Sequence, residues 1–426
     1  MDHNKISKAL RPYSAELSCL PEEVKVNILS RLPVKLLCQC RSVSKEWLGL
    51  ISSPFFRSVH MEISKENHML LLLDSDGDDL DEDDEDEDGI QENADLQNNE
   101  ANNEEMGQIN HPDEVVQVGY KIKSMPGIRP ICFTAMDLKG VIEYMFSIPV
   151  DGKFDMLPSN HGLVCFNNNG NFHVYNPSTQ AFLALPAASA STCDETVSTF
   201  GYLPSTKEYK LAHMYDRSMS LYINDIGCEI YTLSAGTTPG EITAVQPFWK
   251  QIKEKCPFAV DGKGVLANNV FYWLIWDDHA DRENKLVLSL DLEEEKFKVV
   301  PHPPVISRTS NPIAHDIQLI ELRGNLCLVG SYADPPVMDI WMLETDGSNI
   351  AWTKEYSLDL SLLDDFDIHS TQIGVVGYHN GEIIVDSGTE GLDFYNVETQ
   401  TFRRQFNMNF KTNTKLCLYT DCFATF

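Results

Sequence analysis

The apolar residues near the N-terminus recur at the spacing of an α-helix. From Leu17 the chain reads LSCLPEEVKVNILSRLPVKLLCQCRSVSKEWLGLISSPFF, in which Val24, Ile28 and Leu32 lie four residues apart, on one stripe. Pro21 suits the first turn of a helix, because its missing N–H has no partner there, and the acids that follow favour the positive end of the helix dipole. The pattern predicts a first helix from about Pro21 to Pro33.

The same stretch predicts two more short helices. Pro33 ends the first and opens a second, and Ser42 or Ser44 caps a third, with Pro54 ending the set. The apolar positions of the two helices are Leu36, Leu37, Cys40, Val43 and then Trp47, Leu50, Ile51. Three short helices bury little surface, so we expect the module to need a partner or a neighbouring domain.

After Met61 the pattern changes to short strands of Val, Ile, Phe and Tyr between Gly, Asn, Asp and Pro turns, as in an all-β domain. Four segments begin at a Gly or Asn and run into an apolar strand, namely Gly162-LVCF, Asn269-VFYW, Asn325-LCLV and Gly381-EIIV. They start 107, 56 and 56 positions apart, so the repeat is roughly 55 residues, with the first gap close to two periods.

A second landmark, a turn followed by an aromatic residue, recurs in VYNPSTQAF, SLDLEEEKF and FYNVETQTF, at Asn176, Asp291 and Asn396. About five units follow Asn160, and the stretch from Met61 to Pro158 supplies one more. Repeats of this length are typical of kelch-like propeller blades. We therefore expect a β-propeller of about six blades, closed by the C-terminal KLCLYTDCFATF; a two-sheet sandwich would not need so many regular repeats.

An acidic run interrupts the first repeat. Residues 74–114 hold about nineteen Asp and Glu and no Lys or Arg, so like charges repel and little apolar surface is available to offset the entropy of ordering. Strand-like HMLLLL precedes the run and strand-like VVQVGYKI, from Val115, follows it. We expect a disordered insert within the first blade, either a solubilising spacer or a segment that recruits a basic partner.

The amino-acid composition restricts the kinds of partner that the chain is expected to bind. The formal net charge of −31 falls to roughly −12 without the acidic run, and no basic stripe appears, which argues against nucleic acid. The eleven cysteines form no C-x-x-C pair and are interpreted as reduced thiols. With no signal peptide and no apolar run long enough to span a bilayer, we expect no membrane partner and a cytoplasmic or nuclear location.

The helical stretch resembles an F-box. The matching pieces are Leu20-Pro21-Glu22, Ile28-Leu29-x-Arg31-Leu32-Pro33, Arg41-x-Val43-x-Lys45-x-Trp47 and Ile51-x-x-Pro54-Phe55. The resemblance implies that one face packs against a Skp-type adaptor, which links the chain to a cullin. That face carries Leu20, Pro21, Val24, Ile28, Leu32 and Leu36. The alternative is that these positions form only an internal three-helix core.

The β-rich part resembles the F-box-associated domain of plant F-box proteins. HGLVCF, YNPSTQAFLALP, FGYLPSTKEYKL, CEIYTL, FYWL and LSLDLEEEKF occur in that family's order. The resemblance implies a non-catalytic receptor subunit of a Skp–cullin–F-box ubiquitin ligase whose propeller binds the protein to be ubiquitinated. An F-box scaffold or regulator outside ubiquitination is the alternative. The domains are then a flexible tail (1–13), the F-box (14–58) and the propeller domain (59–426).

No motif nominates a catalytic residue, a cofactor or a metal. The segment from Gly262 to Ala267 matches a dinucleotide fingerprint, but a strand follows it where a helix is needed, so we interpret it as a blade turn. The acids from Asp74 lack the glycine of a calcium loop. A solvated loop explains the cluster of Asp277, Asp278, His279, Asp281 and Glu283 better than a metal does.

Target binding is expected in the loop from Asp277 to Asn284, at one rim of the propeller, because loops vary freely while strands are fixed by packing. The candidate residues are Trp276, Asp277, Asp278 and His279. The other tryptophans at strand positions are interpreted as blade core. A propeller oxidase or hydrolase is a third alternative, although nothing in the sequence nominates its active site.

Overall fold

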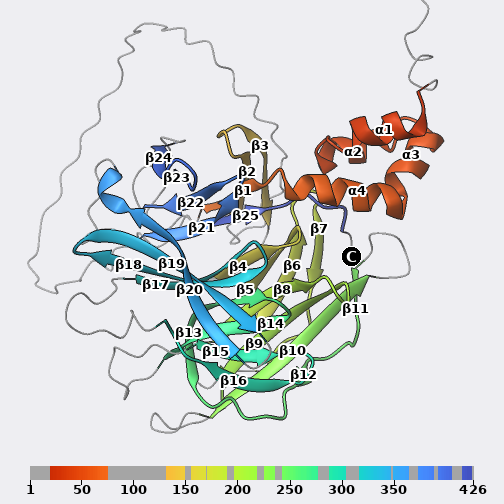
Figure 1. Cartoon of the computed structure of the whole chain (residues 1–426). Helices are drawn as coiled ribbons and strands as arrows, with labels where there is room; N and C mark the ends of the chain where they lie inside the picture. Colours follow the sequence, from red (N-terminus) through yellow and green to blue (C-terminus); the bar gives the residue numbers. More distant parts are fainter. Residues whose placement is uncertain are drawn as a thin grey trace, which may run out of the picture.

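The computed structural model has an N-terminal helical module beside a ring of β-sheets (Figure 1). The structure describes residues 20–74, 131–148, 155–168, 170–189, 196–217, 225–235, 242–276, 287–303, 316–346, 349–363, 373–387, 392–404 and 415–424. The expected N-terminal tail and the acidic run, apart from Asp74 at a strand end, lie outside these residues.

The helical module has four helices, α1 (Glu22–Leu29), α2 (Val34–Cys40), α3 (Lys45–Ser52) and α4 (Pro54–Lys65). The three expected helices are present, and Ser44 caps α3 by accepting a hydrogen bond from the Trp47 amide at 3.1 Å. The expectation that Pro54 ends the module is wrong. Pro54 is the first residue of α4, a position where proline costs no hydrogen bond, and Ser53 caps it through the Phe56 amide.

Six sheets of antiparallel strands follow, so the expected propeller and its number of blades are confirmed. Blade 1 comprises β25 (Lys415–Tyr419), β1 (Met69–Asp74), β2 (Ile131–Asp137) and β3 (Ile142–Ile148). Blade 2 comprises β4 (Asp155–Asn160), β5 (Leu163–Asn168), β6 (Asn171–Asn176) and β7 (Ala181–Ala184). Blade 3 comprises β8 (Val197–Leu203), β9 (Glu208–Asp216), β10 (Ile226–Ala235), β11 (Ile242–Ala244) and β12 (Lys250–Gln251).

The remaining blades have the same antiparallel order. Blade 4 comprises β13 (Ala259–Ala267), β14 (Val270–Trp276), β15 (Val287–Asp291) and β16 (Lys296–Val300). Blade 5 comprises β17 (Asp316–Leu322), β18 (Asn325–Ala333), β19 (Pro336–Asp346) and β20 (Asn349–Asp359), followed by the short 3-10 helix η3 (Leu360–Leu362). Blade 6 comprises β21 (Gly374–His379), β22 (Glu382–Asp386), β23 (Leu392–Asn396) and β24 (Thr401–Arg404).

Apolar clusters between neighbouring blades hold the ring together. Phe133 of blade 1 packs with Phe166 of blade 2, and Leu72 of blade 1 packs with Phe394 of blade 6. Comparable clusters join the other four pairs of neighbours. The C-terminal strand β25 pairs with β1, as in Leu71 opposite Cys417. Pairing of distant strands closes the ring without leaving an edge at the junction.

The sequence landmarks fall at equivalent places in the blades. Each apolar segment of the first landmark is the second strand of its blade, and a two-residue turn with positive φ precedes it in blades 2, 4, 5 and 6. In blade 5, for example, Arg323 and Gly324 have φ of 53° and 85° between the paired residues Leu322 and Asn325. Such turns favour Gly and Asn, which explains the recurring residues.

The strand order defines two rims. At the first, which we call the helix rim, the turns between first and second strands meet α4, which leads into β1, and the segment that follows β25. At the opposite rim, which we call the far rim, second strands connect to third strands and each blade connects to the next. Residues 75–130 join β1 to β2 within blade 1; the strand expected from Val115 lies outside the described residues, and the partner of β1 is β2.

Candidate functional site

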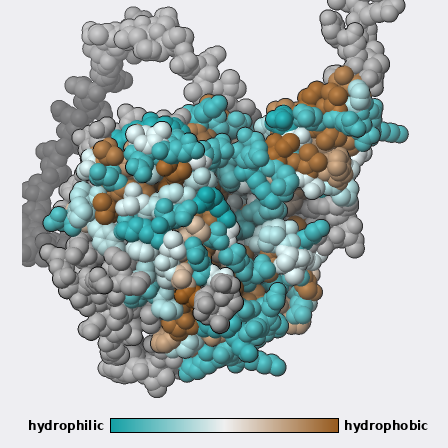
Figure 2. Space-filling view, in the orientation of Figure 1, coloured by the Kyte–Doolittle hydropathy of each residue, from teal (hydrophilic) through white to brown (hydrophobic). Residues whose placement is uncertain are grey.

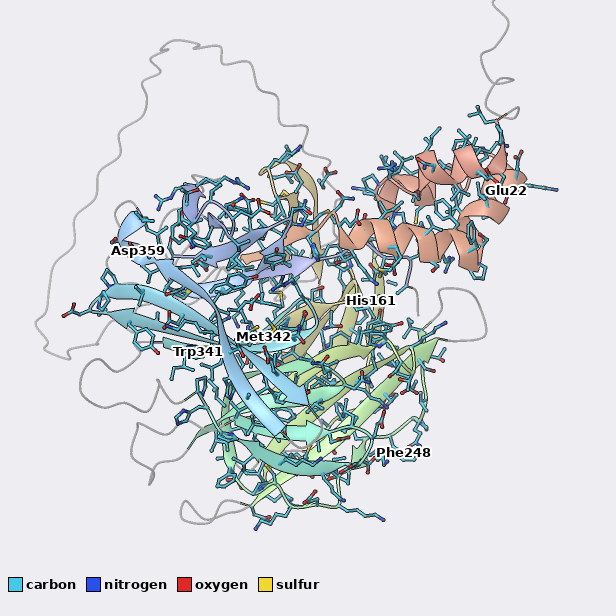
Figure 3. The ribbon with its side chains drawn as sticks, viewed as in Figure 1. Glu22, His161, Phe248, Trp341, Met342 and Asp359 are labelled. Atoms are coloured by element: carbon cyan, nitrogen blue, oxygen red, sulfur yellow. The ribbon has the colours of Figure 1, made fainter. Side chains whose placement is uncertain are left out.

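One face of the helical module is apolar and open to solvent. Val24, Ile28 and Leu36 are 40%, 50% and 45% exposed, Pro21 is exposed, and Leu20 and Leu32 are half-buried. Figure 2 shows hydrophobic surface gathered over the helical module. In Figure 3 Glu22, the first residue of α1, lies on the part of this module away from the propeller. The expected adaptor-binding residues thus include exposed apolar side chains that the described residues leave uncovered.

A separate set of side chains forms the core of the module. Buried residues from all four helices pack together, namely Val26, Leu29, Val34, Leu37, Ile51 and Phe56. Leu32 and Trp47 pack against this cluster from half-buried positions, whereas Val43, expected on the second helix, follows its end and is exposed. Because Val24, Ile28 and Leu36 lie outside the cluster, an internal core does not account for them.

An ion pair fixes the exposed helix against its neighbour. The Lys25 ammonium lies 2.5 Å from the Glu46 carboxylate, joining α1 to α3, and the Lys25 side chain is only 8% exposed. Since Lys25 sits next to Val24 on α1, the pair restricts the orientation of the apolar face. A preorganised face binds a partner with a smaller loss of conformational entropy.

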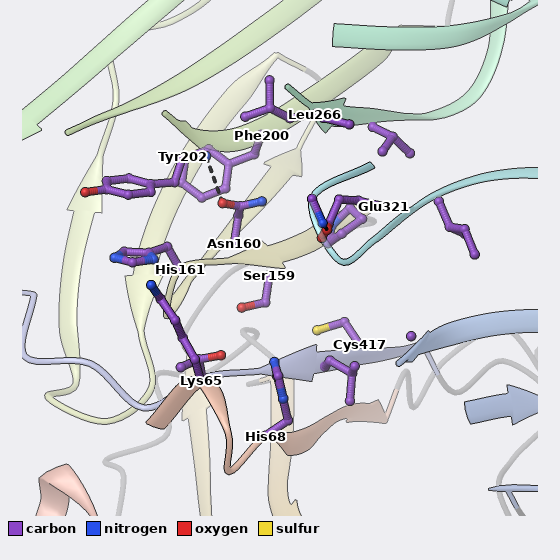
Figure 4. Close-up of a pocket in the computed structure, with 18 of the residues that line it drawn as sticks. Lys65, His68, Ser159, Asn160, His161, Phe200, Tyr202, Leu266, Glu321 and Cys417 are labelled. Carbon is purple, nitrogen blue, oxygen red and sulfur yellow. Dashed lines mark hydrogen bonds between the residues drawn. The ribbon is translucent and has the colours of Figure 1, made fainter. Parts of the chain in front are cut away.

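A hollow lies within the ring beneath α4. It has a volume of about 1990 Å³ and is lined by the first strands of the blades and by side chains of α4, including Met61 and Lys65. At its mouth the rings of His161 and Tyr202 stack at 3.9 Å, and the Tyr202 amide donates to the Asn160 side chain at 2.8 Å. Figure 4 shows Lys65 pointing toward His161.

The histidines at this mouth are neutral at physiological pH. Burial, together with the nearby Lys65 ammonium, lowers the pKa of His161 to about 4. Burial also lowers the pKa of His68 to about 4, where the His379 ring lies 3.4 Å from it. The uncharged His161 ring stacks on Tyr202, and the uncharged His68 ring meets His379 edge to face, so both contacts at this mouth are between rings.

The described cysteines give little support to a reactive thiol. Eight cysteines whose side chains the structure describes are free thiols, and six of these are buried. Burial raises the pKa of Cys256 and of Cys417 to about 11, so both remain protonated at neutral pH. Within the same residues no group of three or more His, Cys, Asp or Glu side chains is placed to hold a metal ion.

The residues proposed for target binding are placed only in part. Trp276 is the last residue of β14, whose end lies at the far rim. Asp277, Asp278 and His279, with the rest of their loop and the metal cluster weighed there, lie outside the described residues, as does most of the calcium-like run.

The glycine-rich segment has a steric explanation. Gly262 to Ala267 belongs to strand β13, which contains a bulge between Asp261 and Val265, so its interpretation as a blade turn is wrong. A side chain at Gly264 would lie 2.0 Å from the Thr199 hydroxyl and 2.3 Å from the Trp273 ring nitrogen. The close approach of two blades therefore requires the glycine.

The propeller tryptophans whose side chains the structure describes lie mainly in the core. Trp273, Trp249 and Trp341 are buried and Trp352 is half-buried. The Trp273 indole donates to the Thr199 hydroxyl at 2.7 Å, linking blades 4 and 3. None of the helices in the described part of the chain is long and apolar enough to cross a membrane.

Family models match both parts of the chain. A model described as an F-box associated beta propeller domain matches residues 135–424, and one described as F-box-like matches residues 17–62. An F-box protein of Arabidopsis thaliana is 31% identical over 240 residues, covering 52% of this chain and 54% of that protein. The match thus spans about half the length of this relative.

Two other relatives from Arabidopsis thaliana match over longer stretches. A putative F-box/kelch-repeat protein is 23% identical over 364 residues, covering 80% of this chain and 71% of that protein. The F-box protein CPR1 is 22% identical over 367 residues, covering 80% and 73%. Among solved structures, the Dos1 propeller is 14% identical with a TM-score of 0.33, over 65% of this chain and 66% of that chain; a likeness at this score says nothing further.

Proposed function

Because this chain belongs to the plant F-box proteins that carry an F-box-associated β-propeller domain, we propose that it is the substrate-recognition subunit of a Skp–cullin–F-box ubiquitin ligase. F-box proteins are generally non-catalytic adaptors. In this proposal the helical module binds a Skp-type adaptor, the adaptor binds a cullin, and the propeller holds a target protein. The chain contributes proximity, since catalysis belongs to other subunits.

The exposed apolar face of α1 and α2 is the observation that carries the proposal. Val24, Ile28 and Leu36 lie outside the F-box core and are exposed to solvent. Exposed apolar side chains gathered on one surface are typical of a protein interface. Together with Leu20, Pro21 and Leu32 they form the face that the F-box resemblance assigns to the adaptor. We call these six residues the adaptor face.

We assign the two rims of the propeller to different contacts, one with the F-box and the other with the target. The F-box occupies part of the helix rim, where α4 and the segment after β25 enter it. The far rim carries the connections between second and third strands, including the one that starts at Trp276. We propose that the target binds there, with Trp276, Asp277, Asp278 and His279 among its contacts. A target held on that rim would face away from the adaptor-bound helices.

Reconstitution tests the assignment to a ligase. The purified chain is mixed with a Skp-type adaptor and a cullin and passed over a sizing column. The proposal expects all three to co-elute, and a Leu20→Ala, Pro21→Ala double variant to elute alone. Binding of the adaptor without the cullin would favour the alternative, an F-box scaffold or regulator outside ubiquitination.

The target-binding rim has its own experiment. The loop from Asp277 to Asn284 is replaced by a short Gly-Ser turn, and proteins stabilised by cullin inhibition are compared between the wild type and the variant. The proposal expects loss of target turnover with adaptor binding intact. Unchanged turnover would move the target site to another loop.

A further inference from the structure

The segment Thr420–Ala424 crosses from the propeller to the F-box. It follows β25, the closing strand, and Asp421, Cys422, Phe423 and Ala424 are all buried. Nothing in the F-box motif indicates such a contact, because the segment lies more than 350 residues from the helices in sequence. Its burial shows that both domains pack around it.

On the F-box side, Phe423 completes the core of the helices. It belongs to the same apolar cluster as Val34 and Leu37 of α2 and Phe56 of α4. Its ring centroid lies 6.2 Å from that of Phe56 and 5.1 Å from that of His60, in edge-to-face arrangements. The guanidinium of Arg57 lies over the same ring at 5.5 Å. Burial of this aromatic side chain fastens the segment to α2 and α4.

On the propeller side, Asn176 holds the backbone of the segment. Its side-chain amide donates to the carbonyl oxygens of Cys422 at 3.1 Å and Ala424 at 2.8 Å, and the Asn176 side chain is fully buried. Thr179 donates to the Ala424 carbonyl at 2.9 Å. Ser178 also donates to the Asp421 carboxylate, which in turn accepts a hydrogen bond from the Val34 amide of α2.

Comparison of the equivalent turns in three blades shows which side-chain group of Asn176 binds the segment. Asn176, Asp291 and Asn396 occupy the same turn in blades 2, 4 and 6, and the side-chain oxygen of each accepts a hydrogen bond from the amide two residues on. Because blade 4 uses aspartate, this turn needs only the oxygen. The NH₂ group of Asn176 is therefore free to bind the two carbonyls of the segment.

We propose that the segment Thr420–Ala424 is a clasp that positions the adaptor face relative to the propeller. Asn176, Asp421 and Phe423 are its positioning residues. They act through α2, which carries Leu36, and through α4, whose Met61 packs against the cluster between blades 2 and 3. This role rests on the proposed function, since it concerns the same adaptor face. The clasp makes the F-box and the propeller one rigid unit, so that adaptor and target keep a fixed separation.

Asn176→Asp is the sharpest test. The variant keeps the oxygen that the turn needs but replaces the NH₂ group by a carboxylate oxygen facing two carbonyl oxygens, which repels the segment. The matched control is Asn396→Asp, the same change at the same turn of blade 6. Hydrogen exchange of the full chain, followed peptide by peptide, reports release of the segment, and calorimetric titration with a Skp-type adaptor reports the adaptor face.

We expect Asn176→Asp to raise exchange in the peptides spanning α2 and residues 420–424 by roughly tenfold or more and to weaken adaptor binding by about tenfold, with Asn396→Asp unchanged in both. Unchanged exchange would overturn the clasp. Faster exchange with unchanged adaptor affinity would overturn the positioning role. If the wild type itself fails to bind the adaptor, the proposed function fails, while exchange still decides whether the clasp exists.

A second pair of variants covers the case in which Asn176→Asp does not fold. Phe423→Ala removes the aromatic ring from the F-box core without adding charge. Its control, Phe248→Ala, removes an exposed ring of the propeller, seen in Figure 3. The clasp predicts faster exchange in α2 and α4 and weaker adaptor binding for Phe423→Ala alone. Equal behaviour of the two variants would contradict it.

Discussion

The backbone amide of Val34 donates a hydrogen bond to the carboxylate of Asp421 across 2.9 Å, joining two residues that are 387 positions apart. Val34 begins α2, and the preceding Pro33 supplies no side-chain cap. The first amides of a helix lack partners within the helix and need an acceptor. Asp421 provides that acceptor from the far end of the chain, so folding of α2 is coupled to closure of the propeller.

Replacement of Asp421 should therefore loosen α2. Asp421→Ala leaves the buried Val34 amide without its acceptor, which typically costs about 1–3 kcal/mol. Burial raises the pKa of Asp421, so the neutral side chain of Asp421→Asn should be tolerated better than alanine. Native-state hydrogen exchange of the α2 peptides measures the difference. Equal protection in Asp421→Ala and the wild type would mean that this hydrogen bond contributes nothing.

Stability should fall on mild acidification. Burial lowers the pKa of His213 to about 4, outweighing a hydrogen bond with the Ser189 carbonyl that acts in the opposite direction. A base whose folded pKa lies below its unfolded value contributes stability above the unfolded value of about 6.5, and that stability is lost as the pH falls toward 4. At pH 5 the loss for this residue is on the order of 2 kcal/mol.

His213→Phe checks this dependence. The free energy of unfolding is measured by urea titration at several values between pH 7 and pH 5. The variant loses the hydrogen bonds of the imidazole, so its free energy of unfolding at pH 7 should drop. Its free energy of unfolding should also fall less steeply with decreasing pH, by an amount that corresponds to the uptake of up to one proton on unfolding. Parallel slopes would show that the His213 ring is not kept neutral by burial.

The acidic run should be dispensable for folding. Asp74 at the end of β1 pairs with Cys132 near the start of β2, so the two ends of the intervening segment lie at adjacent strands. Closing a long loop costs only slightly more entropy than closing a short one. Replacing residues 75–114 by a short Gly-Ser linker should leave the thermal melt and adaptor binding nearly unchanged. A fall of many degrees would place the run in the structural core.

Replacing residues 75–130 is the companion variant. It also removes the strand-like segment from Val115, while β1 and β2 are still joined. If only this longer replacement lowers the melting temperature, the residues between the acidic run and β2 contribute to the blade. If both replacements melt like the wild type, the whole connection is an insertion into blade 1.

The repeat was readable from sequence because its turns are chemically demanding. Two consecutive residues with positive φ favour Gly and Asn, and this marks the second strand in blades 2, 4, 5 and 6. In blade 3 a four-residue turn joins Leu203 to Glu208 instead, so the landmark is missing and the gap covers two periods. The segment from Gly262 was mistaken for a turn for a related reason, because its glycines are required by a β-bulge and by a close contact between blades.

The adaptor face could be predicted in part from the sequence, whereas the clasp could not. Helical spacing identified the stripe of Val24 and Ile28, but spacing alone could not separate exposed residues from core, and Leu32 proved half-buried. Helix α4 was missed because Pro54 is equally compatible with ending one helix and starting another. Phe423 was assigned only to the closing strand, because a contact with helices so distant in sequence has no local signal.

The central claim is that the exposed apolar face of the F-box binds a Skp-type adaptor. Calorimetric titration of the wild type, Ile28→Asp and Ile350→Asp tests it most directly. The control makes the same substitution at an isoleucine of β20 with 46% exposure, close to the 50% of Ile28. We predict tight binding by the wild type and by Ile350→Asp, and a loss of more than about 2 kcal/mol, or roughly thirtyfold, for Ile28→Asp. Full affinity of Ile28→Asp would contradict the account.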